Sequence, residues 1–342
     1  MSEEERGYLK AQTIKIDYKT ARFHRRVLAN LVDFALCALF FFSFFIGIRG
    51  IVTNIDPYKA REAELISIRL NSGMYMQYVD SGKTTDTVSF LSDSYNAYSG
   101  IAKVDIAKEK IDTFILYLET NVNAEAADKV RNSYHTFFLS DKMVYEGVPM
   151  FIDNAGKIER NKDCKASADV RFSKAYAPFI DEYCQGYLIT LVPQYLDLVR
   201  FESNVLIYGE ILPAYLIAPL LAYLLPMMVF KRGRQTFGKW MYRIGTVNKD
   251  LLIPSVPRTL ARFVILYFLE FCLAPFTFAI PFLVSVSLMG FSKKHQGLPD
   301  YILGLHEVDV TNAKIYFSRE EIAVESVSGA KKAPDFEVIY ED

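Results

Sequence analysis

The sequence is poor in cysteine, tryptophan and histidine, and neither sign of charge is in excess. Four Cys among 342 residues are too few for a disulfide scaffold. Lys and Arg number 39 against 40 Asp and Glu, which excludes nucleic-acid binding by bulk positive charge, so we expect no nucleic-acid partner. Hydrophobic residues make up 51% of the chain and 26 residues are Phe, which excludes a disordered protein.

Three long hydrophobic segments interrupt the charged parts of the chain. They cover residues 27–48, 205–230 and 263–291. As a helix the first would be roughly 33 Å long, about the thickness of the hydrocarbon core of a bilayer. Helices in soluble cores are rarely this long and this apolar, so we predict that the chain spans a lipid bilayer. The first segment follows 26 mostly polar residues and lacks a small-x-small cleavage site, so we expect it to remain as an anchor.

The charges between these segments predict an orientation. Residues 1–26 hold seven Lys or Arg and four acids, and residues 231–262 hold eight Lys or Arg and one acid. Residues 56–204 hold 17 basic and 22 acidic residues. By the positive-inside rule, the N-terminus and residues 231–262 are cytoplasmic and residues 56–204 are outside. We therefore expect a multi-pass protein of the cell membrane.

The third hydrophobic segment is compatible with two arrangements. Its 29 residues suit one tilted span and are too few for two full spans. Pro275 and Pro281 lie near its middle, where each removes a backbone donor and disturbs a helix. Both flanks are basic, with Arg262 before and Lys293 and Lys294 after. A re-entrant hairpin keeps both ends on the cytoplasmic side, and we favour it. A single kinked span remains the alternative.

Residues 56–204 have the pattern of a mostly helical domain. Apolar residues recur at helical spacing over 106–118 and 126–138, on either side of Asn123, which predicts a helical hairpin. Residues 148–160 predict a turn between short strands. Twelve Tyr in this block form either a binding face or, more commonly, an aromatic core.

The predicted fold class is an all-α membrane helical core with a mostly helical α+β extracytoplasmic domain. The core contains two transmembrane helices and a third hydrophobic segment broken by proline. The predicted parts are a cytoplasmic N-terminus (1–26), a first transmembrane helix (27–52), the extracytoplasmic domain (53–204), a second transmembrane helix (205–230), a basic cytoplasmic segment (231–262), the third hydrophobic segment (263–291) and a C-terminal region with a flexible tail (292–342).

Acidic residues inside the hydrophobic segments are the first candidates for function. An acid at the centre of a span costs about 2.5–3.5 kcal/mol, so its presence needs a reason. Arg26 and Asp33 are seven positions apart and share one helix face. Asp33 either pairs with a basic residue and fixes helix packing, or binds a proton or cation. Glu210 lies near a span end, where we expect a solvated acid, whereas Glu270 lies deeper and is the better candidate.

Other motifs predict little chemistry. Cys164 and Cys184 form a disulfide if their compartment is oxidising, and two free thiols are the alternative. Residues 233–239 fit G-x4-G-K, but Trp240 stands where a phosphate-binding loop has Ser or Thr. No spacing matches a zinc site and no Ser/His/Asp or Cys/His arrangement stands out, so we expect no metal, no cofactor and no enzyme.

Four short patterns occur in order along the chain. They are Arg26-x-x-Ala29-x-x-Val32-Asp33, Thr236-Phe237-Gly238-Lys239 with the following 243–247, the sequence PRTLAR at 257–262, and KHQGLPD at 294–300. Together they resemble the RDD family of bacterial membrane proteins, over about residues 21–52 and 206–310. The resemblance implies that Arg26, Asp33 and Asp300 are the family's named residues and that residues 56–204 are a large insert. It also implies that Asp300 is cytoplasmic, and that it caps or pairs with the basic 231–262 segment.

Two functions fit these features. Transport, including cation/proton exchange, has been proposed for the family, and Asp33 and Glu270 are compatible with it. A transporter with three segments needs self-association, so we then expect a homo-oligomer. The alternative is a membrane-anchored receptor or assembly/envelope protein whose extracytoplasmic domain binds a protein partner, and the large acidic, Tyr-rich block favours it.

Overall fold

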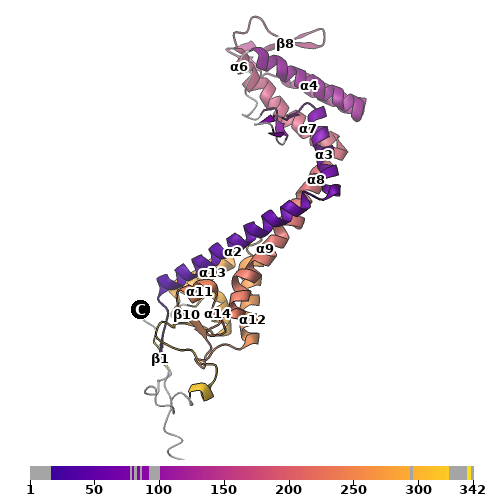
Figure 1. The fold of residues 1–342 in the computed structure, drawn as a ribbon. Coiled ribbons are helices and arrows are strands. Elements are labelled where there is room, and N and C mark those ends of the chain that lie inside the picture. Colours follow the sequence, from indigo (N-terminus) through magenta and orange to yellow (C-terminus); the bar gives the residue numbers. More distant parts are fainter. Residues whose placement is uncertain are drawn as a thin grey trace, which may run out of the picture. The chain divides into compact units, whose positions relative to one another are not determined.

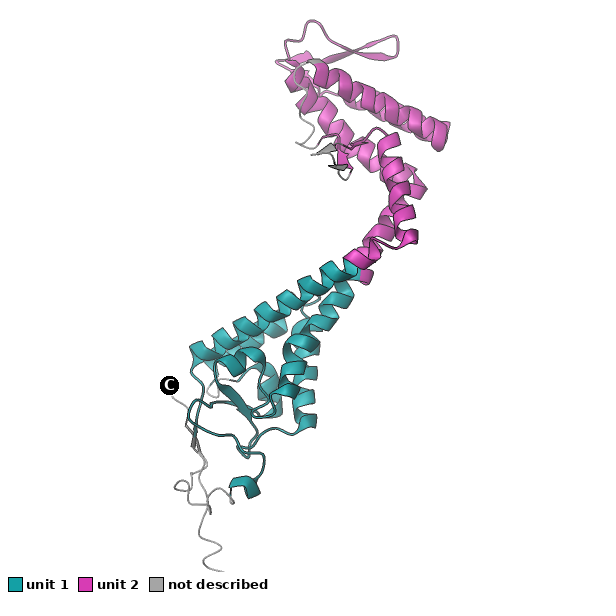
Figure 2. Ribbon diagram, in the orientation of Figure 1, with its two compact units in different colours: residues 1–49, 210–342 teal, residues 50–209 magenta. Residues whose placement is uncertain are grey.

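The computed structural model describes residues 17–77, 79–80, 83–84, 87–91, 101–292, 296–322 and 337–339. The chain is mostly helical and divides into two compact units (Figures 1 and 2). Unit 1 is formed from residues 1–49 and 210–342, and unit 2 from residues 50–209. The start of the predicted N-terminal region and nearly all of the predicted flexible tail lie outside the described residues.

Among the residues that the structure describes, two helices are long and apolar enough to cross a membrane, judged by length and composition. The first is α2 (Phe23–Val52). The second runs over Pro193–Val229, so it begins before the predicted residue 205. It joins α8 (Pro193–Asn204) of unit 2 to four consecutive helical segments, which are η4 (Val205–Ile211), α9 (Leu212–Pro219), η5 (Leu220–Leu224) and α10 (Leu225–Val229). The η segments are π-helical and lie beside the prolines, where the regular hydrogen-bond pattern is interrupted.

Small side chains join the two long helices. Cys37 of α2 forms a buried cluster with Ala218 and Ala222. Further along α2, Arg49 forms an ion pair with Glu210. Residue numbers therefore rise along α2 as they fall along its neighbour, so the two helices are antiparallel. Small residues at such a contact let two backbones approach closely.

The third hydrophobic segment folds as a helical hairpin. Its first leg is α12 (Val256–Ile265), continued by the π-helical η6 (Leu266–Cys272), and its second leg is α13 (Ile280–Phe291). Between the two legs, Phe278 and Ala279 have positive φ angles, which interrupt the helical backbone and let the chain turn. The legs contact each other, and α12 and α13 both contact α14 (Leu298–Leu303). How this hairpin lies in a bilayer stays a prediction.

A small β structure completes unit 1. Strand β10 (Ile244–Val247) pairs antiparallel with β11 (His306–Asp309), with Ile244 opposite Asp309. Strand β1 (Asp17–Lys19) pairs in parallel with β12 (Glu337–Ile339), and a bridge joins Thr20 to Val308. The short helix α11 (Phe237–Met241) directly precedes β10. The strands share an apolar core formed by Tyr18, Val247, Leu251, Ile253, Val308, Ile315 and Ile322.

Unit 2 contains the predicted helical hairpin. It consists of α4 (Ile101–Asn121) and α5 (Ala124–Phe138), and the Asn123 side chain accepts the Ala126 N–H at the start of α5. The predicted turn between short strands is also confirmed, between β8 (Phe151–Asn154) and β9 (Lys157–Arg160). The other elements are α3 (Asp56–Asn71), β2 (Tyr75–Met76), β3 (Val79–Asp80), β4 (Lys83–Thr84), β5 (Val88–Ser89), β6 (Val144–Tyr145), β7 (Val148–Pro149), α6 (Ala168–Arg171), η2 (Phe172–Tyr176), η3 (Phe179–Cys184) and α7 (Gln185–Leu191).

Aromatic side chains fill the core of unit 2. Phe138 and Phe179 are fully buried and contact each other and their aromatic neighbours. None of the tyrosines that the structure describes in residues 56–204 is exposed, so these tyrosines belong to a core and do not form an exposed binding face. Cys164 and Cys184 are both buried free thiols, and no disulfide joins them. Burial raises the pKa of the Cys184 thiol.

Candidate functional site

One face of α2 carries two charged side chains into the interior of unit 1. The buried residues of α2 are Arg26, Ala29, Asp33 and Cys37, which confirms the shared face predicted from their spacing. Arg26 is 4% exposed and Asp33 is completely buried. Because a buried charge is costly unless it is paired and hydrogen-bonded, the partners of these two residues define the site.

Asp33 binds the start of helix α11. One carboxylate oxygen accepts the backbone N–H of Gly238 at 2.7 Å, and the other accepts the hydroxyl of Thr236 at 2.5 Å. Thr236 is the N-cap of α11 and also accepts the N–H of Lys239. An acid at a helix N-terminus satisfies unpaired N–H groups and complements the partial positive charge there. Asp33 thus fixes helix packing, but through hydrogen bonds from α11 and not through the ion pair considered from the sequence.

Gly238 is required by the contact between α11 and α2. A Cβ atom at this position would lie 2.0 Å from the carbonyl oxygen of Ala29 and 3.0 Å from the Asp33 carboxyl carbon. Ala29 is itself fully buried. The absence of a side chain at Gly238 therefore allows the backbone of α11 to reach the Asp33 carboxylate.

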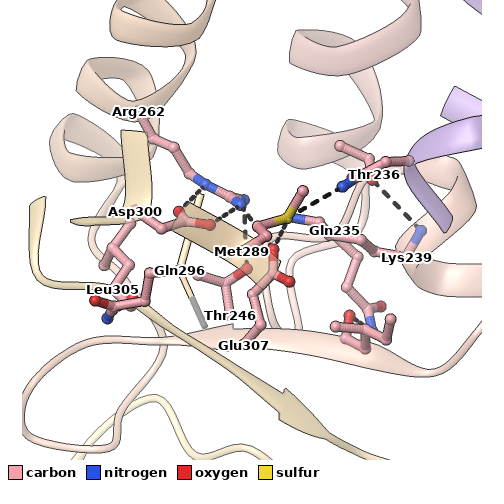
Figure 3. Close-up of polar contacts among 12 residues, drawn as sticks. Gln235, Thr236, Lys239, Thr246, Arg262, Met289, Gln296, Asp300, Leu305 and Glu307 are labelled. Carbon is pink, nitrogen blue, oxygen red and sulfur yellow. Dashed lines mark hydrogen bonds and ion pairs between the residues drawn. The ribbon is translucent and has the colours of Figure 1, made fainter. Parts of the chain in front are cut away.

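A chain of ion pairs continues from α11 through the hairpin to β11 (Figure 3). Lys239 of α11 pairs with Glu307 of β11. Arg262 of α12 holds Asp300 of α14 with two hydrogen bonds, 2.5 Å and 2.7 Å long. Arg262 also donates to Glu307 at 3.4 Å and to Thr246 of β10 at 3.3 Å. Asp300 is thus paired with a cation of the basic 231–262 segment.

The charges of this network balance. Arg26 lies close enough to Glu307 and Asp300 to interact with both electrostatically. Three cations therefore face three acids, and all six are buried; they are Arg26, Lys239, Arg262, Asp33, Asp300 and Glu307. Burial by itself would raise the pKa of Glu307, but the charges of Lys239, Arg262 and Arg26 outweigh it and lower this pKa to about 2. Glu307 is consequently ionised at neutral pH.

Neutral side chains hold the segments around this network in place. The Gln235 amide donates to the Ile244 carbonyl at 2.9 Å, and the Gln296 amide donates to the Leu305 carbonyl at 2.6 Å. The Leu298 N–H donates to the hydroxyl of Ser285 in α13 at 3.0 Å, which ties α14 to the hairpin. The two Gln bonds fix the start of β10, which carries Thr246, and the start of β11, which carries Glu307.

The two remaining candidate acids form no ion pair with this network among the described residues, although the charges of Lys239, Arg262 and Asp300 reach Glu270. Glu270, on η6, is half-buried, and its Oε1 has no hydrogen-bond partner among the described residues. Glu210 was expected to be solvated, and this expectation is wrong. Its side chain is 1% exposed and pairs with Arg49 at 3.2 Å, because η4 turns it towards α2.

Sequence reasoning missed Glu307. It lies in a four-residue strand outside the hydrophobic segments, so neither periodicity nor an intramembrane position marks it. The one available signal is the number of cations, since three buried cations require about as many acids. Among the described residues, no group of three His, Cys, Asp or Glu side chains is placed to hold a metal ion.

The long apolar helices point to a helical membrane protein. The model of the RDD family, a family of membrane proteins, matches residues 176–304, so this part of the chain is similar to that family. The match includes Lys239, Arg262 and Asp300 of the network, and Glu270, but neither α2 nor Glu307. No curated protein and no solved structure matches the chain.

Proposed function

We propose that this chain is a membrane-anchored protein whose unit 2 binds a protein partner and whose charged network is structural. The observation that carries the proposal is the pairing of the two buried acids Asp33 and Asp300. Both oxygens of Asp33 and both of Asp300 accept hydrogen bonds from buried groups. An incoming cation would have to displace these partners, and breaking a buried ion pair costs about 3–5 kcal/mol. Asp33 and Asp300, two of the acids that a transport path would use, are therefore already occupied.

The arrangement of unit 2 along the chain supports the same function. Unit 2 begins at residue 50, where α2 is about to end, and finishes at residue 209 within the second long helix. The two antiparallel helices thus both lead into it. It has its own apolar core, which includes Leu65, Ile111, Phe114, Phe138 and Phe179. A domain of this size can bury its own core, and such a domain on two anchoring helices suits recognition of another protein.

The decisive experiment is a flux measurement with a crosslinking arm. Purified full-length protein is reconstituted in proteoliposomes and tested for proton movement driven by a cation gradient. We expect none, and flux from the wild type would overturn the proposal.

The crosslinking experiment uses two variants in native membranes. A photo-crosslinking residue replaces Leu116 of unit 2, which is 62% exposed, in one variant and Phe42 of α2, which is 58% exposed, in the other. We expect a discrete protein adduct from position 116 and lipid adducts from position 42.

One observation favours a second candidate function, cation/proton transport. Glu270 lies in the third hydrophobic segment with a buried carboxylate oxygen that has no hydrogen-bond partner among the described residues. It is also the acid in excess, since the other buried charges of the hairpin region balance. If flux is found, Glu270→Gln should abolish it and leave the fold intact. Asp33→Asn would then reduce flux only as far as it destabilises the protein.

A further inference from the structure

Helix α11 has two different faces. Gly238 and Lys239 are buried against α2 and Glu307, while Trp240 and Met241 are 50% and 51% exposed. Trp240 is the single tryptophan of the chain. The buried face is explained by the charged network, but nothing in that network requires an exposed Trp–Met pair. Its neighbours indicate what this pair contacts.

Trp240 lies against the end of the second long helix. Its ring stacks on Phe230, with ring centres 5.4 Å apart and planes at 2°. Phe230 directly follows Val229, the last residue of that helix. Trp rings are enriched where a membrane span ends, because one part of the ring is apolar and its N–H needs a polar partner. The Trp–Met pair is therefore continuous with the apolar surface of a span.

Exposed cations lie close to this pair in the sequence. Of the eight Lys and Arg in residues 231–262, Lys239 and Arg262 are used in buried ion pairs. Lys231 and Arg232 follow Phe230 directly and are exposed. Arg243 is also exposed, and its backbone N–H donates to the Trp240 carbonyl at 3.1 Å. Three exposed cations thus follow the end of the span or the aromatic pair within a few residues of the chain.

We propose that Trp240, Met241, Lys231, Arg232 and Arg243 form a binding site for the headgroup of an anionic phospholipid. The cations attract the phosphate, and the Trp and Met side chains lie at the boundary between headgroup and acyl chain. Each basic residue near an anionic membrane surface favours binding of such lipids by about fivefold. A soluble partner would not explain why the apolar part of the patch continues the surface of a membrane span.

The single tryptophan supplies the probe. Full-length protein is placed in phosphatidylcholine vesicles that contain a small fraction of either brominated phosphatidylglycerol or brominated phosphatidylcholine. Bromine quenches Trp fluorescence on contact, so the comparison reports which lipid occupies the site. We expect phosphatidylglycerol to quench at a lower fraction than phosphatidylcholine. High salt should reduce this preference without any substitution, because it screens the attraction.

The test variant replaces Lys231, Arg232 and Arg243 by Ser. Its matched control replaces Lys157, Lys162 and Lys165, three exposed cations of unit 2, by Ser. The preference for phosphatidylglycerol should be lost in the first and kept in the second. Equal quenching of the wild type by both lipids would overturn the proposal. Quenching by aqueous acrylamide without quenching by either lipid would also overturn it, and would place the patch against water or a protein.

Discussion

The carboxylate of Asp33 accepts the backbone N–H of Gly238 at 2.7 Å, although 205 residues separate the two along the chain. This bond joins the first long helix to the short helix that follows the second. The two residues lie on either side of the whole of unit 2 in the sequence, so the bond closes unit 1 around its charged network. Its removal should therefore be measurable as a loss of stability.

Asp33→Ala should destabilise unit 1. The substitution leaves the buried Gly238 N–H and the Thr236 hydroxyl without their acceptor, and each such loss costs about 1–3 kcal/mol. Thermal unfolding of the detergent-solubilised protein, followed by circular dichroism, measures the effect. Asp33→Asn keeps an acceptor oxygen for Gly238 and should lose less. Equal stability of the Ala variant and the wild type would show that α11 does not depend on Asp33.

Gly238→Ala tests the close approach of α11 to α2. The added Cβ would meet the Ala29 carbonyl oxygen at 2.0 Å, so α11 has to move away and lengthen its bond to Asp33. We expect a cost of about 1–3 kcal/mol, the usual range for overpacking. Gly47→Ala is the matched control, since a Cβ there meets nothing within 4 Å. It should be neutral or stabilising, and a loss equal to that of Gly238→Ala would contradict the packing argument.

Much of the helical structure could be predicted because helices leave local signals. The spacing of Arg26 and Asp33 was enough to place both on one face, and the turn near Asn123 was marked by the repeat on either side of it. The π-helical turns beside the prolines of the second long helix were not predicted. They depend on how neighbouring segments satisfy the freed backbone groups, which is a tertiary property.

The site was predicted in part, for the same physical reason. An acid in a hydrophobic segment stands out, so Asp33 and Glu270 were found, and the sequence pattern also marked Asp300. The groups that bind them do not stand out, because nothing in the sequence marks a Thr hydroxyl or a Gly backbone amide as a hydrogen-bond donor to an acid far away in the chain. Glu307 was missed because a charged residue is ordinary in a short polar strand. Its importance comes from Lys239 and Arg262, which only the fold brings to it.

Glu307 should make the stability of the folded protein fall as the pH is lowered. Its pKa in the folded protein, about 2, lies below the ordinary value of 4.5. The stabilisation by its negative charge is therefore complete above about pH 4.5 and is lost as the pH falls towards 2. Chemical unfolding of the wild type over this range should show stability falling with pH.

The Glu307→Gln variant removes this contribution at every pH. The variant should be less stable than the wild type at neutral pH, because Lys239 loses its ion-pair partner. Between pH 4.5 and 2 the stability of the variant should fall less than that of the wild type. Glu320→Gln changes an exposed acid and serves as the control, with the wild-type pH profile expected. A Glu307→Gln profile parallel to that of the wild type would assign the acid sensitivity to other groups.

The helical hairpin should enter and leave the bilayer on one side. Helix α13 has 12 residues and is about 18 Å long, shorter than the roughly 30 Å hydrocarbon core. Both legs contact α14, so their outer ends lie together. Phe276 and Phe278 at the turn between them are 83% and 91% exposed, which suits a tip within lipid. A single kinked span would instead separate the ends of the hairpin by the whole membrane.

Single cysteines introduced at exposed positions distinguish the two arrangements. Ser255→Cys precedes the hairpin, Glu320→Cys follows it, and Lys165→Cys marks unit 2. Position 300 is unsuitable, because Asp300 is buried against Arg262. In intact cells, an impermeant thiol reagent should label position 165 and leave both 255 and 320 protected until the membrane is opened. Labelling of position 320 but not 255 would establish the kinked span. Labelling of 255 and 320 together, with 165 protected, would keep the hairpin and reverse the orientation deduced from the basic segments.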